Sequence, residues 1–475
     1  MKRLHSRLLL AATLTLVGAV AIWGGRNLAA RRAWAAMRPA PPEAQGAAAP
    51  GLDARLAACN DRLQTWPPDR GALAEFTRLC HANGLIEPAI SGYRALMILE
   101  PGEARWPHLL ASILAGYGRL DEALPLLRRA TVLAPDHLVG WLRLGKALFK
   151  ANATAEAEAV YRETLQRAPG NPFALLGLAR CDLRQDRWTA ARSHLQQAVA
   201  ADPKFADAQS LLASVFDRLG NPEAAAIARR HVADEGYYSE PPDSWSDELT
   251  AFCHTPYTLL VTASATTSGG TPAKALPALE RALELAPEDP RVHRQLAKTL
   301  SSLGDMAGAR TELEKAVALA PGDENLQIDL VALLRAVKDR AAVERAVTAG
   351  VAACPTSAAL HFDAGLIAAD AGRLEEAAEH FRFSWQNRPD QSAAARELAR
   401  VYFRSHRDEE GVAVLERVLA VEPRDTAAHI LLVGHGLEMG DPRTEGWLRR
   451  AMGTGAPELI ELQQNFQRRS GREVR

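Results

Sequence analysis

Residue types that perform chemistry are present in this chain, but they do not stand at the spacings of known sites. The five cysteines are far apart and form no CxxC pair, so we expect small buried thiols and neither a zinc knuckle nor a disulfide framework. The thirteen histidines are scattered, and none has a cysteine or carboxylate neighbour at the spacing of a metal site. Cys253 and His254 match only the end of a c-type haem attachment sequence, whose first cysteine is missing. The sequence therefore predicts no metal and no cofactor.

Catalytic motifs are absent from the sequence as well. It contains no HExxH, GxSxG or GxxxxGK and no GxGxxG that opens a helix, and SGGTPAK at 268–274 is only superficially similar to a phosphate-binding loop because it falls within a repeat turn. We predict that the chain is not an enzyme and has no small-molecule substrate. An enzyme with a site near residues 237–257 is the least favoured alternative, and it would need Cys253 or His254 for turnover.

The charge balance excludes another class of function. The chain has 56 Lys and Arg against 57 Asp and Glu, a formal charge of −1, so it lacks the basic excess of a nucleic-acid-binding protein and we expect no nucleic-acid partner. Aromatic residues make up only 6%, whereas Ala and Leu are frequent throughout. This composition favours closely packed helices over strands, and it predicts an almost entirely α-helical protein.

Proline recurs at a fixed interval along the chain. From Pro287 to Pro457 a proline follows every 34 residues, and a second series, out of phase with the first, runs from Pro67 to Pro203. Small residues stand 12 and 24 positions before most of these prolines. Two small columns inside apolar helical patterns predict two antiparallel helices that cross closely in each unit. A glycine 17 positions before the proline marks the turn between the helices in six units.

This pattern is similar to that of tetratricopeptide repeats, whose units also have 34 residues. Residues 138–171 carry the small, aromatic and proline positions of that family, among them Gly145 and Tyr161, and residues 358–391 do so with Phe381. The resemblance implies an all-α, right-handed superhelical solenoid of about eleven 34-residue helical hairpins, in two arrays of five and six units.

A solenoid must also cover its two open ends, which sets the predicted domain organisation. We predict an N-terminal signal or transmembrane anchor (1–32), an Ala/Pro-rich spacer (33–51), a first array with an N-terminal capping helix (52–239), a Pro/aromatic insert (240–255), a second array (256–459), and a C-terminal capping helix and tail (458–475).

The N-terminal segment has the composition of a membrane anchor. Residues 8–25 contain no charged residue and have basic residues on both sides, and at 1.5 Å per residue they reach about 27 Å, enough to cross a bilayer core. A cleaved signal peptide is the alternative, because Ala33-Trp34-Ala35 has the small-x-small form of a cleavage site. We expect a single membrane helix, with the repeats on the exported (periplasmic or extracytoplasmic) side of a bacterial cell.

The insert at 240–255 interrupts the repeats, and aromatic residues gather around it. They are Tyr237, Tyr238, Trp245, Phe252 and Tyr257. In one interpretation these rings fill the gap between the two arrays. In the other they form a junction site for a peptide or ligand, made by the three tyrosines and Trp245, because rigid rings give contact area at a small entropic cost.

The resemblance also points to a partner-binding surface. Arrays of this kind use two first-helix positions, here 27 and 23 residues before the repeat proline, to line a concave face. Seven of the 22 residues at these positions are basic and none is acidic: Arg78, Lys146, Arg180, Arg294, Lys298, Arg396 and Arg400. This bias predicts a protein or peptide partner with an acidic segment. The alternative is that these are solvated side chains with aliphatic stems on neighbouring helices.

These observations predict a non-catalytic, membrane-anchored scaffold that binds a partner protein or peptide in its concave groove. Its role would be assembly or adaptation, for instance in the cell envelope or in cytochrome maturation. The alternative is a substrate-recruiting accessory subunit of a separate enzyme, such as a glycosyltransferase or a protease.

Overall fold

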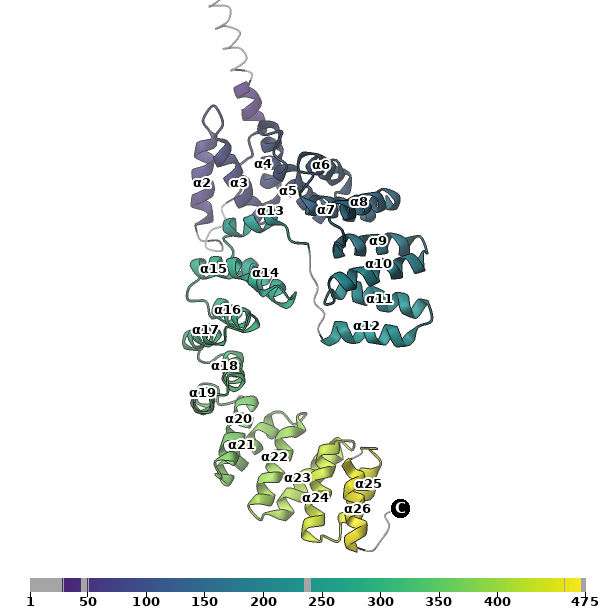
Figure 1. The fold of residues 1–475 in the computed structure, drawn as a ribbon. Coiled ribbons are helices and arrows are strands. Elements are labelled where there is room, and N and C mark those ends of the chain that lie inside the picture. Colours follow the sequence, from purple (N-terminus) through teal and green to yellow (C-terminus); the bar gives the residue numbers. More distant parts are fainter. Residues whose placement is uncertain are drawn as a thin grey trace, which may run out of the picture. The chain divides into compact units, whose positions relative to one another are not determined.

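The structure, a computed structural model, describes residues 28, 30–43, 49, 51–234, 241–456 and 458–470 of the chain. The described residues are helical and contain no β-strand (Figure 1). The chain divides into two compact units, residues 1–288 and 289–475.

Besides the short helix at residues 30–37, the first unit contains sixteen described helical segments, two of them 3₁₀ turns labelled η. They are α2 (Leu52–Leu63), α3 (Arg70–Ala82), α4 (Ile86–Leu99), α5 (Arg105–Gly116), α6 (Leu120–Leu133), α7 (Leu138–Lys150), α8 (Thr154–Arg167), α9 (Pro172–Arg184), α10 (Trp188–Ala201), α11 (Ala206–Arg218), α12 (Pro222–Asp234), α13 (Ser244–Asp247), η2 (Glu248–Phe252), α14 (Pro256–Ser268), η3 (Pro272–Ala275) and α15 (Leu276–Leu285).

The second unit continues the repeat pattern. Its helices are α16 (Pro290–Ser302), α17 (Met306–Leu319), α18 (Glu324–Ala336), α19 (Arg340–Ala353), α20 (Ala358–Asp370), α21 (Leu374–Asn387), α22 (Ser392–Arg404), α23 (Asp408–Val421), α24 (Thr426–Met439), α25 (Thr444–Met452) and α26 (Glu458–Ser470).

Consecutive helices pair as hairpins, which confirms the predicted helical-repeat solenoid. Five hairpins run from α3 to α12, and six further hairpins from α14 to α25, among the described residues. Local signals begin many of the helices: Asn171 caps α9 by accepting from the Ala174 N–H, and Pro172 occupies its first turn. The division between the units falls after Glu288, so the hairpin α14–α15 belongs to the first unit.

The small columns let an aromatic ring fit between helices. The Tyr161 ring of α8 lies against the backbones of α7 and α9, where an added Cβ would stand 2.6 Å from the ring at Gly145 and 2.3 Å from it at Gly177. Phe381 of α21 packs against Gly365 of α20 in the same way, at 2.7 Å. A side chain at these positions would therefore displace the ring, which explains why the columns are small.

The turn between the two helices of each hairpin uses a left-handed residue in every unit. Where glycine is missing from this column, other residues still adopt positive φ: Asn152 (61°), Asp186 (56°), Lys338 (60°) and His406 (57°). The sequence pattern predicted the turn glycines. It did not predict that every residue 17 positions before the repeat proline has the same left-handed backbone conformation. Lysine and histidine in this region carry a steric cost that glycine avoids.

Replacing Lys338 or His406 with glycine is expected to raise the free energy of unfolding of the second unit. The gain is about 1 kcal/mol each, because relief of the left-handed strain exceeds the extra entropy of the unfolded chain. Urea unfolding of each variant measures this gain. The matched control is Asn152→Gly, which should gain less because asparagine tolerates this conformation, and equal gains at all three positions would contradict the argument.

The N-terminal end of the first unit contains a half-buried histidine. His81 Nδ1 lies 2.8 Å from the Tyr93 hydroxyl, an interaction between α3 and α4. Burial lowers the pKa of His81 from 6.5 to about 4. Between pH 6.5 and pH 4, His81 is protonated in the unfolded chain but neutral in the folded chain. The first unit therefore loses stability as the pH falls through this range.

We expect the protonation of His81 alone to lower the free energy of unfolding by about 2 kcal/mol as the pH falls from 7 to 5. Urea unfolding of the wild type and of His81→Gln at both pH values tests this. The variant should show a weaker pH dependence by that amount. The same pH dependence in both proteins would show that His81 does not carry the effect.

The predicted membrane anchor requires a correction. Residues 8–25 lie outside the described residues, and within the described ones no helix combines the length and apolar character needed to cross a bilayer. This contradicts the predicted localisation, a single N-terminal membrane helix with exported repeats, and that prediction is wrong. Where the structure describes the N-terminal region, residues 30–37 are helical and Trp34 packs into protein, with 4% of its surface exposed and its Nε1 donating to the Leu63 carbonyl (3.1 Å).

Candidate partner-binding groove and its strap

Residues 241–255, which we call the strap, return from the end of the first five hairpins to their beginning. The strap contains α13 and η2, and it packs on the face formed by the first helices of the hairpins (Figure 1). Trp245 stacks on His137 at the start of α7, with ring centroids 3.7 Å apart and planes 14° apart. The same indole meets the His108 ring of α5 edge to face at 5.1 Å. Two imidazoles from neighbouring hairpins thus hold one indole.

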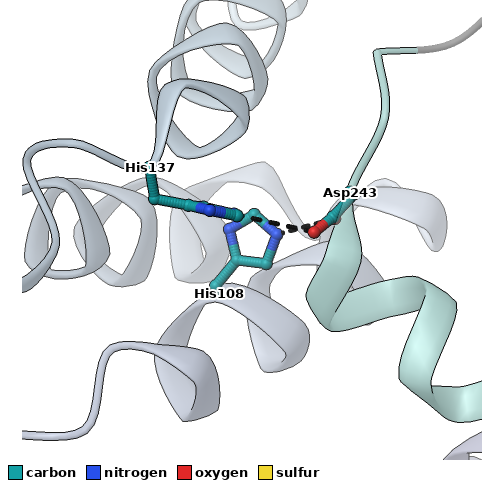
Figure 2. A group of neighbouring side chains, drawn as sticks. All are labelled: His108, His137 and Asp243. Atoms are coloured by element: carbon teal, nitrogen blue, oxygen red, sulfur yellow. Dashed lines mark hydrogen bonds and ion pairs between the residues drawn. The ribbon is translucent and has the colours of Figure 1, made fainter.

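A polar cluster beside Trp245 fixes the strap more firmly. Figure 2 shows His108 and His137 pointing towards Asp243 of the strap. One carboxylate oxygen, Oδ2, lies 2.9 Å from His108 Nε2, 2.6 Å from the Arg143 guanidinium and 2.8 Å from Ser246 Oγ. The other oxygen, Oδ1, lies 3.6 Å from His137 Nε2, longer than a hydrogen bond. Asp243 is only 5% exposed and His108 is fully buried.

The protonation states follow from this arrangement. Burial would raise the pKa of Asp243, but the His108 and His137 rings and the charge of Arg143 together hold this pKa well below its usual range. Burial lowers the pKa of His108 despite its hydrogen bond to Asp243. A neutral His108 therefore donates through Nε2 to an ionised Asp243. Its Nδ1 is left buried without a hydrogen-bond partner, as are His137 Nε2 and Asp243 Oδ1.

The cluster also resembles a metal site in composition. Among the described residues, His108, His137 and Asp243 are the one group of such side chains whose ligand atoms lie within 4.8 Å of one another. The Arg143 guanidinium, however, already contacts the carboxylate at 2.6 Å and would repel a divalent cation there. The donor set fits a hydrogen-bonded ion pair better than a metal. Sequence reasoning missed this cluster because His108 and Asp243 are 135 residues apart.

The far end of the strap is fastened to α3 and to α15. The Arg78 guanidinium lies over the Phe252 ring, 4.4 Å from its centroid. The Asn83 side chain donates to the Phe252 carbonyl (2.8 Å) and accepts from the His254 N–H (2.7 Å). Arg281 of α15 donates to the Cys253 carbonyl (3.1 Å). The strap thereby joins the hairpin α14–α15 to the first hairpin of the chain.

Beyond the strap, the same face is open and contains a cavity of about 380 Å³. We call the surface of α5, α7, α9 and α11 around this cavity the open groove. Its apolar wall includes the rings of Tyr161, Phe173 and Phe205, and Pro241 of the strap borders it. Its charged lining residues are Arg143, Lys146, Lys150, Arg180 and Asp207. Four cations against one carboxylate make this lining basic.

Comparison with known families settles what these hairpins are. Two family models described as tetratricopeptide repeat match the chain, one at residues 150–215, 268–349 and 368–433 and the other at 108–172 and 340–392. Together these ranges cover more than half of the chain. The chain is a tetratricopeptide repeat protein.

Two curated relatives resemble part of this tetratricopeptide repeat protein. Both are cellulose synthase operon protein C: that of Pseudomonas fluorescens (strain SBW25) is 28% identical over 161 residues, which are 32% of this chain and 12% of the relative. That of Xanthomonas axonopodis pv. citri (strain 306) is 28% identical over 173 residues, 35% of this chain and 11% of the relative. The matched region thus spans a small part of either relative.

Solved structures are similar at the level of the repeats. MamA from Desulfovibrio magneticus RS-1 is 19% identical, with a TM-score of 0.33 over 35% of this chain and 93% of that one. Yeast Tom70 is 14% identical, with a TM-score of 0.32 over 85% of this chain and 95% of that one.

The residues predicted for the concave face have different surroundings. In the first unit, Lys146 and Arg180 line the open groove, and Arg180 lies 3.6 Å from Asp207. Arg78 is instead covered by the strap, with Phe252 beneath its guanidinium and Glu248 at 4.0 Å.

In the second unit each predicted cation has an acidic neighbour. Arg294 and Lys298 share Asp329, at 2.6 and 3.7 Å. Arg396 pairs with Asp425 at 2.6 Å, and Arg400 lies 3.5 Å from Glu397. These acidic partners do not stand at the two first-helix positions, 27 and 23 residues before the repeat proline, at which the basic excess was found. The excess at those positions therefore overstates the net positive charge of this face.

Of the predicted junction residues, the structure brings only Trp245 into a cluster. Tyr257, at the start of α14, is 68% exposed. Tyr237 and Tyr238 lie outside the described residues. The five cysteines are buried and free, and burial raises the thiol pKa of Cys59 and Cys181 to about 11, so these two thiols are protonated and unreactive at neutral pH.

Proposed function

We propose that this tetratricopeptide repeat protein is a non-catalytic scaffold that binds an extended segment of a partner protein in the open groove. The observation that carries the proposal is the cavity of about 380 Å³ on the first-helix face, lined by aromatic rings and by four cations against one carboxylate. Stacked hairpins hold this surface rigid before binding, so little conformational entropy is lost when a partner docks.

The lining indicates the chemistry of the segment. Tyr161, Phe173 and Phe205 form an apolar wall that suits an apolar side chain, while Lys146 and Arg180 suit a neighbouring carboxylate. The open groove is a better candidate than the corresponding face of the second unit. Cations of both faces have carboxylates nearby, among them Arg180 and Arg143 of the open groove. The cavity and its aromatic wall are what favour the open groove.

Site-specific photo-cross-linking in the native cells tests this proposal. A photoreactive residue at Ser112, in the open groove, should capture a defined protein, whereas one at the exposed Arg192 of α10 should not. The double variant Lys146→Glu, Arg180→Glu should abolish the capture. The matched control reverses two exposed arginines of second helices, Arg192 and Arg230. Capture that survives reversal of the groove charges would refute the proposal.

A second candidate function is that of an accessory subunit that recruits substrate to a separate glycosyltransferase. The similarity to cellulose synthase operon protein C favours it, although the match covers only 12% and 11% of those proteins. The test is affinity purification from native cells, followed by an assay of glycosyl transfer from nucleotide sugars. Transferase activity that copurifies with the wild type and not with the groove variant would support this candidate, and its absence would count against it.

A further inference from the structure

We infer that His108, His137 and Arg143 form a specific binding subsite for a partner segment in which a carboxylate stands two residues before a tryptophan. We call these three residues the strap subsite. In the structure the chain's own sequence Asp243-Ser244-Trp245 occupies it. The inference deepens the proposed function and rests on it, because it names the chemistry of a partner for the same face.

The recognition groups belong to the repeat array and not to the strap. His108 stands on α5 at one of the first-helix positions expected to face a partner, Arg143 on α7, and His137 at the start of α7. They present two hydrogen-bonding groups to one carboxylate oxygen and two imidazole rings to one indole, one stacked on it and one edge to face. A segment of another protein with the same two groups at the same spacing would find every one of these contacts.

The fit of the strap is incomplete, which makes it exchangeable. Asp243 Oδ1, His137 Nε2 and His108 Nδ1 are buried without a hydrogen-bond partner. Each such atom destabilises the bound strap, because burial removes its hydration and no hydrogen bond replaces it. A strap evolved only to fasten two parts of the chain would gain from satisfying them. A partner segment whose flanking residues donate a hydrogen bond to the second oxygen of its own carboxylate would bind this subsite better than the strap does.

The strap subsite and the open groove are also continuous. Arg143 belongs to both, since its guanidinium holds Asp243 and its side chain lines the cavity. Pro241 of the strap lies at the border of the cavity. A partner segment that fills the open groove therefore meets the strap end first and can extend into the subsite only by displacing it. Because the strap is tethered, it competes at a high effective concentration and masks the subsite in the isolated protein.

A peptide-binding experiment on the full-length chain tests the inference. The probe is a fluorescently labelled synthetic peptide with the sequence of residues 239–250, SEPPDSWSDELT, measured by fluorescence anisotropy. The double variant Asp243→Ala, Trp245→Ala, which loosens the strap, should bind the probe at least about tenfold more tightly than the wild type. The matched control Asp247→Ala, Tyr257→Ala changes two exposed residues, one in the strap and one at the start of α14, and should behave as the wild type.

The specificity of the probe decides the chemistry. Replacing its Asp243 by Asn, or its Trp245 by Ala, should each weaken binding by about tenfold, and adding His108→Ala to the loosened variant should do the same. Addition of Zn²⁺ or EDTA should leave binding unchanged. Zn²⁺-dependent binding would overturn the assignment, since it would make the trio a metal site.

A milder variant guards against misfolding, and two outcomes distinguish failure of this inference from failure of the proposed function. If the double variant unfolds, the milder Asp243→Asn takes its place, because it keeps the size of the side chain and removes the charge. A folded loosened variant that does not bind the probe overturns the inference, even if photo-cross-linking at Ser112 still captures a partner. Loss of that capture with intact probe binding would instead refute the proposed function alone.

Discussion

Replacing Asp243 with alanine is expected to lower the free energy of unfolding of the first unit by about 3 kcal/mol and to release the strap. Removal of one partner from a buried ion pair costs about 3–5 kcal/mol because the other partner remains buried and unpaired. The lower end applies here, since the Arg143 side chain is 28% exposed and can recover some hydration. Urea unfolding measures the loss of stability. Chymotrypsin, which cuts after the strap residues Trp245 and Phe252, measures the release.

The matched control for this prediction is Asp247→Ala. Asp247 stands one turn further along the same segment but is exposed, so its removal should change stability by less than about 0.5 kcal/mol and leave the strap protected. Equal losses in the two variants would show that the Asp243 cluster does not hold the strap.

Replacing Gly177 with alanine is expected to lower the free energy of unfolding by about 2 kcal/mol, even though alanine favours helices over glycine by about 1 kcal/mol. The new Cβ would stand 2.3 Å from the Tyr161 ring. The ring has little room to move, because it also packs against α7, where a Cβ added at Gly145 would stand 2.6 Å from it. Overpacking therefore exceeds the gain in helix propensity. Urea unfolding of the variant gives the difference directly.

Gly434→Ala provides the control for this second prediction. Gly434 also lies inside a helix, α24, but an added Cβ there meets nothing within 4 Å. The substitution should therefore stabilise the second unit by about 1 kcal/mol. Stabilisation at both glycines would show that room for the aromatic rings is not the reason why small residues occupy these columns.

The repeat fold could be predicted from the sequence because its determinants are local and recur. Gly145, Ala157, Tyr161 and Pro169 lie within one 34-residue unit, and a pattern that repeats is visible without any knowledge of long-range contacts. The left-handed conformation of Lys338 and His406 was hidden only because their side chains give no sign of it.

The strap cluster could not be predicted in this way. His108, His137 and Asp243 come from two repeats and an insert, and no periodicity relates them. The sequence did mark the place, since Trp245 and Phe252 stand out as aromatic residues within a proline-containing interruption. It could not show that these rings lie on the first-helix face. It also could not show that Asp329 and Asp425 of neighbouring helices partly neutralise the basic columns of the second unit.

The contacts between Asn83 and the strap change how the first unit should fold. In an ordinary solenoid each repeat touches only its neighbours, so the ends can fray and unfolding can begin at either of them. Here Asn83 bonds to Phe252 and His254, 169 and 171 residues further along the chain. These bonds tie the first hairpin to the segment that follows the fifth, so neither end can detach without opening the closure. The five hairpins should consequently unfold in one cooperative transition, and they should refold more slowly than an open array of equal length, because so large a loop must close before its contacts form.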